Sequence, residues 1–296
     1  MAQQVGQLSV KFSRRELLAG AASLVALPAY AQRAQQDDPI ISGFARHLPV
    51  LAQHGMVASQ EMLASRIGID IMKRGGNAVD AAIATGFALA VTLPRAGNIG
   101  GGGFMLIHIA SEKKTVAIDY REMAGALATH AMFLDGDGRF IPSKSQASGL
   151  GVGVPGTVAG FALAHEKYGS KKFTLAELIE PAIALARDGI VVEDDLADSL
   201  PSGMRRMGKY APSREIFLKS DGSNYQRGDR LFQKDLARSL QLMAEQGPRA
   251  FYEGEVADKI IAAVKAEGGH LTREDFAAYR ACLLYTSDAA DEGLGV

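Results

Sequence analysis

The chain has 296 residues, of which 47% are hydrophobic and 22% charged, a composition typical of a globular protein with enough apolar side chains for a large core. Its net charge of −1 at pH 7 excludes a strongly basic surface, so neither nucleic acid nor an anionic membrane surface is an expected partner. Cys282 is the only cysteine of the sequence, which excludes a disulfide bond within the chain.

Residues 1–31 have the three-part order of a secretory signal peptide. A basic start that contains Arg14 and Arg15 precedes an apolar stretch over 17–29, and small residues allow cleavage after Ala31. The arginine pair ahead of two leucines resembles a twin-arginine signal. The apolar stretch is shorter than a membrane-spanning helix, so we expect no stable membrane insertion. The segment therefore predicts a periplasmic or secreted bacterial protein; the alternative is an N-terminal helix of the core.

A polar leader over 32–46 follows, and we expect the folded part over 47–281. Its first helix is predicted over 60–74, because apolar side chains recur there at four-residue spacing. Ser59 is placed to cap that helix, and the glycine pair after it ends it.

A second helix is predicted over 78–93, with Asn77 as its cap and Pro94 as its stop. This segment is apolar nearly all round, which indicates a buried helix. Two short apolar runs come after a glycine-rich loop, at 104–110 and 115–120. They predict a hairpin of two well-buried strands.

The second half of the chain is predicted to be mainly helical. A helix begins at Thr157, and Thr174 with Glu177 forms a capping box before another helix that Pro181 is expected to kink. The acidic run at 193–198 is interpreted as a charged helix start. Later helices are predicted near 233–246, 254–267 and 272–279. The fold class is therefore α/β or α+β. Because two or three strands make a small sheet for such a chain, we expect the sheet to be incomplete.

The loop over 96–103 contains four consecutive glycines and raises the question of phosphate binding. A dinucleotide loop needs glycines at its first, third and sixth places between a strand and a helix. Here the sixth place after Gly101 and Gly103 is Leu106, and the loop follows a helix and precedes a strand. We interpret the glycines as steric, since they allow other backbone to approach closely.

Arg121 and Glu122 follow directly on the second predicted strand. Arginine suits a carboxylate ligand, because its planar guanidinium donates two parallel hydrogen bonds. The alternative is a structural ion pair or a solvated strand end. The six histidines show no metal-ligand spacing, and no Gly-x-Ser-x-Gly motif occurs, so the residues alone form no complete catalytic set and imply no metal or cofactor.

Several long motifs, in the same order along the chain, resemble the large subunit of γ-glutamyltranspeptidases (glutathione hydrolases). They are "GMVASQEMLASRIGIDIMKRGGNAVDAAIATGFALAVTLPRAGNIGGGGFMLI", "AIDYREMA", "GVGVPGTVAGFALAHEKYG", "LIEPAIALARDG" and "GGHLTREDFAAY". The resemblance runs from about His54 to about Tyr279.

The resemblance implies the αββα sandwich of N-terminal-nucleophile hydrolases, present here as an incomplete fragment. Such proteins are precursors that cleave themselves into a large and a small subunit. The new N-terminal Thr attacks the γ-glutamyl amide of glutathione and related compounds, and water, an amino acid or a peptide then accepts the glutamyl group. We expect that Thr beyond this chain, so the chain should hold no catalytic residue and be inactive alone. Arg121 matches the substrate-binding arginine, with Glu122 as its support.

The chain departs from the family at two places. Gly125 stands where the family has Pro, which predicts a looser loop. The residues after Ala281 lose the resemblance, so 282–296 are interpreted as a non-native tail, like a translated sequencing adapter, the alternative being a divergent natural tail. Two other functions stay open: a β-lactam (glutaryl) acylase of the same superfamily, and a non-catalytic periplasmic protein that binds acidic ligands through Arg121.

Overall fold

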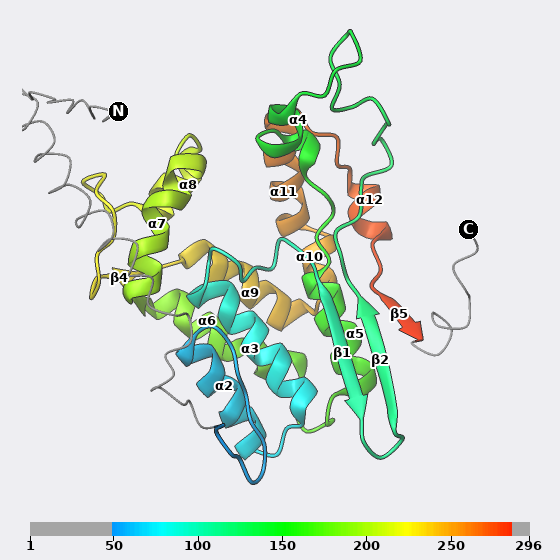
Figure 1. The fold of residues 1–296 in the computed structure, drawn as a ribbon, viewed down its shortest axis with the longest axis vertical. Coiled ribbons are helices and arrows are strands. Elements are labelled where there is room, and N and C mark those ends of the chain that lie inside the picture. The colour runs from blue at the N-terminus through cyan, green and yellow to red at the C-terminus, as the bar shows by residue number, and fades with distance from the viewer. Residues whose placement is uncertain (1–48, 286–296) are drawn as a thin grey trace, which may run out of the picture. The chain divides into compact units, whose positions relative to one another are not determined.

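The computed structural model describes residues 49–285 (Figure 1). The chain divides into two compact units, residues 1–53 and 54–296, and the described part of the first, 49–53, has no regular secondary structure. The predicted signal peptide and polar leader lie outside the described residues. Within the described part, no helix has both the length and the apolar character needed to cross a membrane.

Helices dominate the second unit. They are α2 (Met62–Lys73), α3 (Ala78–Thr92), α4 (Pro142–Gln146), the 3-10 turn η1 (Gly149–Gly151), α5 (Thr157–Tyr168), α6 (Leu175–Asp188), α7 (Asp194–Met207), α8 (Ala211–Phe217), α9 (Lys234–Gln246), α10 (Arg249–Tyr252), α11 (Glu255–Ala266) and α12 (Arg273–Ala278). The strands are β1 (Phe104–Ile109), β2 (Lys114–Asp119), β3 (Ile190–Val191), β4 (Arg230–Leu231) and β5 (Cys282–Tyr285). All predicted helices are confirmed, while α4, α8, α10, β3 and β4 are too short to give a periodic signal.

The first helix begins later than predicted. Glu61, not Ser59, is its cap, because the Glu61 carboxylate accepts hydrogen bonds from the backbone N–H groups of Leu63 and Ala64 (2.9 and 2.8 Å). The Ser59 hydroxyl instead donates to the Glu61 carbonyl (2.8 Å). A carboxylate can accept two N–H groups at once, and its charge favours the helix N-terminus.

The hairpin is confirmed, but one of its strands is less buried than predicted. β1 pairs antiparallel with β2, and β2 pairs with β5, so β2 is central in this three-stranded sheet. Ile107 of β1 is 8% exposed, whereas Leu106 is 72% exposed. Successive side chains of a strand point to opposite faces, and the helices cover only one face of β1. The expectation that both strands are well buried is therefore wrong for β1.

The core lies among stacked helices beside this hairpin. α3 packs against α2, α5 and α6, and α6 packs against α9; α5 also contacts β2 (Figure 1). Phe161 of α5 makes edge-to-face contacts with Phe87 of α3 (5.1 Å between centroids) and with Tyr120 (5.9 Å). Tyr120 directly follows β2, so this aromatic series ties the end of the strand to the helical core. α6 continues through Pro181, and α7 has Asp194 and Asp195 in its first turn, as predicted for a charged helix start.

Candidate substrate-binding site

The end of β2 presents Arg121 to solvent. Its side chain is 66% exposed, and its Nε lies 3.8 Å from Oε2 of Glu122. The guanidinium carbon lies 6.0 Å from the centroid of the Phe104 ring. The two residues that the sequence singles out thus lie side by side at the strand end. Because their ion pair is long and exposed, the guanidinium can still donate two parallel hydrogen bonds to a ligand.

The glycine loop lies against the backbone of Arg121. A Cβ on Gly102 would come within 2.4 Å of the Tyr120 carbonyl oxygen and 2.9 Å of the Arg121 Cα. The Gly103 N–H donates to the Tyr120 carbonyl (N to O, 3.3 Å), and the Tyr120 N–H donates to the Gly103 carbonyl (2.9 Å). The steric interpretation is confirmed for Gly102, because only a residue without a side chain allows this approach, whereas a Cβ on Gly100 would meet no atom within 4 Å.

The loop also occupies the N-terminus of α5. The Gly101 carbonyl accepts hydrogen bonds from the N–H groups of Gly156 and Thr157 at the start of that helix (2.7 and 3.0 Å). Those are the donors that a phosphate would use. The structure thus satisfies them with backbone, in agreement with the rejection of a phosphate site.

Both backbone groups of Arg121 are held by side chains. Its N–H donates to Oδ1 of Asp119 (2.9 Å), and its carbonyl accepts from the hydroxyl of Tyr279 (2.7 Å). Burial, together with the negative charges of Asp119 and Glu122, raises the pKa of Tyr279 to about 12. The phenol therefore stays a proton donor at neutral pH. Tyr279 belongs to the last motif of the resemblance, but no local pattern singles it out, because its partner is distant in the chain.

An open cleft of about 280 Å³ begins at Glu122. Met123, Phe133 and Val152 give it apolar walls, and His270 lies at its edge. Met123, in its lining, is joined to Val154 by two backbone hydrogen bonds (3.2 and 2.7 Å).

The loop at Gly125, which the sequence predicts to be looser than that of the family, contacts α12. The N–H of Ala126 donates to Oδ1 of Asp275 (2.8 Å), and a Cβ on Gly125 would lie 2.9 Å from Leu271. Asp275 also closes the capping box of α12 with Thr272. This carboxylate therefore links the loop to the start of α12.

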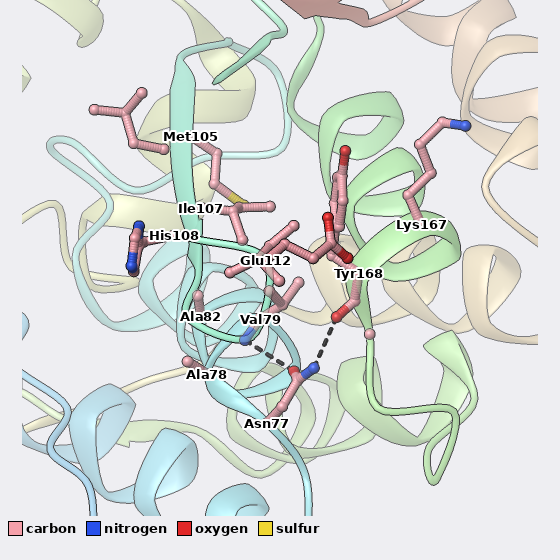
Figure 2. A pocket seen from close by; sticks show the side chains of 13 residues that line it. Asn77, Ala78, Val79, Ala82, Met105, Ile107, His108, Glu112, Lys167 and Tyr168 are labelled. Atoms are coloured by element: carbon pink, nitrogen blue, oxygen red, sulfur yellow. Dashed lines mark hydrogen bonds between the residues drawn. The ribbon is translucent and has the colours of Figure 1, made fainter. Parts of the chain in front are cut away.

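A second cavity, of about 430 Å³, lies between β1, α3 and the end of α5 (Figure 2). Figure 2 shows Met105 and Ile107 directed into it, with His108 on the other side of the strand. The amide group of Asn77, in its wall, is used for structure: Oδ1 accepts from Val79 N–H (2.9 Å), and Nδ2 donates to the Tyr168 carbonyl (2.7 Å). Both groups of the Asn77 amide are therefore used within the fold.

No group of three or more His, Cys, Asp or Glu side chains suited to a metal ion occurs among the described residues. His108 pairs with Thr115 (3.0 Å), and His165 with the Phe173 carbonyl (2.8 Å). These two histidines have structural contacts that the sequence alone could not distinguish from ligand roles.

Comparison with known proteins places these features in a family. The family model described as gamma-glutamyltranspeptidase matches residues 64–286. The glutathione hydrolase proenzyme of Escherichia coli (strain K12) is 51% identical over 234 residues, which cover 79% of this chain and 40% of that protein. The chain thus spans about 40% of the length of this curated relative.

Solved structures agree with the sequence matches. The gamma-glutamyltranspeptidase of Helicobacter pylori superposes with a TM-score of 0.76 at 44% identity, covering 79% of this chain and 67% of that one. A cephalosporin acylase from Bacillus halodurans superposes with a TM-score of 0.70 at 30% identity, covering 84% of this chain and 46% of that one. The predicted fold class is confirmed. The family match and β5 both pass Ala281, and the non-native character of 282–296 stays a prediction.

Proposed function

This chain belongs to the gamma-glutamyltranspeptidase family, and from that premise we propose that it is the N-terminal part of an exported γ-glutamyltransferase or glutathione hydrolase. The observation that carries the proposal is the exposed guanidinium of Arg121 on a backbone anchored at both its N–H and its carbonyl. We assign Arg121 the binding of the substrate's α-carboxylate through two parallel hydrogen bonds. Glu122 supports it as a neighbouring negative charge, with Oε2 3.8 Å from Nε.

The proposed reaction needs groups beyond those of this chain. A Thr at the start of a small subunit, cleaved from the same precursor, attacks the γ-glutamyl amide carbonyl, and its α-amine takes the hydroxyl proton. The C–N bond breaks and the amine leaves with a proton, which leaves a γ-glutamyl ester. Water, an amino acid or a peptide then accepts the acyl group. The name proenzyme, printed for the Escherichia coli relative, supports a cleaved precursor.

The small subunit is the proposed partner for the exposed face of β1. Phe104 and Leu106 are 59% and 72% exposed on that face, and residues of this size are rarely left in water side by side. The secretory pattern of residues 1–31 supports export to the periplasm or exterior. No cofactor is proposed, because the chemistry needs only the nucleophile, its base and donors for the substrate.

The test is a kinetic comparison of Arg121 variants in the full precursor from the source gene. Arg121→Ala should raise KM for a chromogenic γ-glutamyl amide by about 10–100-fold, because charged hydrogen bonds contribute about 1.5–3 kcal/mol. Arg121→Lys should be intermediate, since an ammonium cannot donate in parallel to both oxygens. Arg139→Ala is the matched control: Arg139 is exposed and pairs with Asp137 (3.6 Å). An unchanged KM in Arg121→Ala contradicts the proposal.

The second candidate function is that of an acylase, favoured by the likeness to the Bacillus halodurans cephalosporin acylase. A glutaryl side chain has no α-amino group but has a carboxylate that Arg121 could bind. Parallel assays of a γ-glutamyl amide and a glutaryl amide with the same leaving group separate the two. Higher kcat/KM for the glutaryl amide would replace the first proposal. Ligand binding without turnover by the full protein would instead indicate a binding protein.

A further inference from the structure

Tyr279 occupies a site built around its hydroxyl. It lies between α12 and β5 and is 3% exposed. Its hydroxyl meets the Arg121 carbonyl at 2.7 Å. A Cβ on Gly156 would lie 2.1 Å from that hydroxyl. The backbone at residue 156 therefore leaves room for the hydroxyl oxygen only because this residue is glycine. A tyrosine used only for packing would need no such space for its polar atom.

A second tyrosine stacks on the Tyr279 ring. The Tyr252 ring stacks on it with an interplanar angle of 2° and centroids 5.6 Å apart. The Tyr252 hydroxyl donates to the Pro155 carbonyl (2.9 Å) and accepts from the N–H of Ala159 (3.1 Å). Burial raises the pKa of Tyr252 as well, so its phenol also stays protonated. The Tyr252 hydroxyl thus ties α10 to the start of α5 and makes none of the hydrogen bonds of Arg121.

We propose that Tyr279 is a positioning residue for substrate recognition: its hydroxyl holds the Arg121 carbonyl and so directs the guanidinium toward the substrate carboxylate. This inference rests on the proposed function, in which Arg121 binds that carboxylate. Asp119 holds the Arg121 N–H (2.9 Å), so with Tyr279 in place only the side-chain torsions of Arg121 are free. Without the Tyr279 hydroxyl, the peptide group after Arg121 could rotate. The guanidinium would then spend less time in the orientation that binds the substrate carboxylate.

The test compares Tyr279→Phe with Tyr252→Phe in the full precursor. Tyr279→Phe should raise KM for a γ-glutamyl amide about 3–10-fold, the effect of one neutral hydrogen bond, while kcat changes less than about twofold. Tyr252→Phe removes a hydroxyl from the same stack without touching Arg121, so its KM should stay within about twofold of wild type. In an Arg121→Ala background, Tyr279→Phe should cause no further rise in KM.

Four outcomes distinguish the proposed role of Tyr279 from the alternatives. A rise in KM with Tyr279→Phe alone, absent in the Arg121→Ala background, supports the proposal. An equal rise with Tyr252→Phe, or a fall in kcat alone, would show a general packing role and overturn it. An unchanged KM with Tyr279→Phe overturns it while Arg121→Ala still raises KM. An unchanged KM in Arg121→Ala would contradict the proposed function, on which the Tyr279 proposal rests.

If Tyr279→Phe does not fold, unnatural amino acids at position 279 provide a second test. At position 279, 4-aminophenylalanine keeps a donor on the same ring, and 4-methylphenylalanine keeps the volume without a donor. The first should keep KM within about twofold of wild type, and the second should raise it about 3–10-fold. Equal KM values for the two would overturn the proposal.

Discussion

At the scale of single residues, the site depends on how closely three backbone segments approach. Gly102 lies on one side of Arg121, and Gly156 lies against the Tyr120 carbonyl and the Tyr279 hydroxyl. Protein interiors are packed densely enough that one added methyl group displaces its neighbours. The position of the Arg121 backbone therefore depends on the absence of side chains at Gly102 and Gly156.

Gly102→Ala should destabilise the protein by about 1–3 kcal/mol, because its Cβ would lie 2.4 Å from the Tyr120 carbonyl oxygen, a backbone atom that cannot turn aside. Urea denaturation measures the change in the free energy of unfolding. Gly100→Ala is the control, since a Cβ there meets no atom within 4 Å. Equal free energies of unfolding for the two variants would mean that Gly102 is not needed for the approach.

At the scale of elements, caps decide where the helices begin. Asn77, Thr174 and Thr272 each form a capping box with an acidic residue three places on. Such boxes are visible in sequence because they need only local spacing. Asn77 does more than cap α3, because its Nδ2 donates to the Tyr168 carbonyl at the end of α5 (2.7 Å). It therefore couples two helices that are far apart in the chain.

Asn77→Ala should lower the free energy of unfolding by about 1–2 kcal/mol, because it removes both the cap of α3 and the hydrogen bond to the Tyr168 carbonyl. Asn77→Ser keeps a cap oxygen and lacks the amide donor, so it should be destabilised less. Denaturant titration of the three proteins checks the order. A Ser variant as unstable as the Ala variant would assign the effect to the hydrogen bond with Tyr168 instead of the cap.

At the scale of the whole molecule, β1 has one covered and one exposed face. Ile107 is 8% exposed and packs in the core, while its neighbour Leu106 is 72% exposed. Exposed apolar strand residues promote association between chains. The 296-residue chain by itself should therefore self-associate through this face, as its incomplete sheet predicts.

Leu106→Gln should reduce the mass-averaged size of the chain in sedimentation or light scattering, while its free energy of unfolding changes by less than about 0.5 kcal/mol. Ile107→Ala, one residue on, should instead cost about 2–4 kcal/mol through a buried cavity. Unchanged association in Leu106→Gln would show that another surface drives self-association.

Residue order alone is enough to predict the long helices, the Thr174–Glu177 capping box, the hairpin and the position of Arg121 and Glu122 at a strand end. These features depend on periodicity, on residues a few places apart or on collinear motifs, all of which can be read along the chain. Ser59 shows the limit even locally, because Glu61, two residues further on, caps the helix instead, with its carboxylate accepting from the N–H groups of Leu63 and Ala64.

The contacts that surround Arg121 can be identified only from the tertiary structure. Tyr279 is distant from it in sequence, and Asp275 reaches the Ala126 N–H from a helix that no local pattern links to that loop. The burial of β1 likewise depends on which face the helices cover, since both faces of that strand carry apolar residues. Contacts between distant segments depend on how the whole chain packs. They therefore cannot be predicted from local sequence patterns.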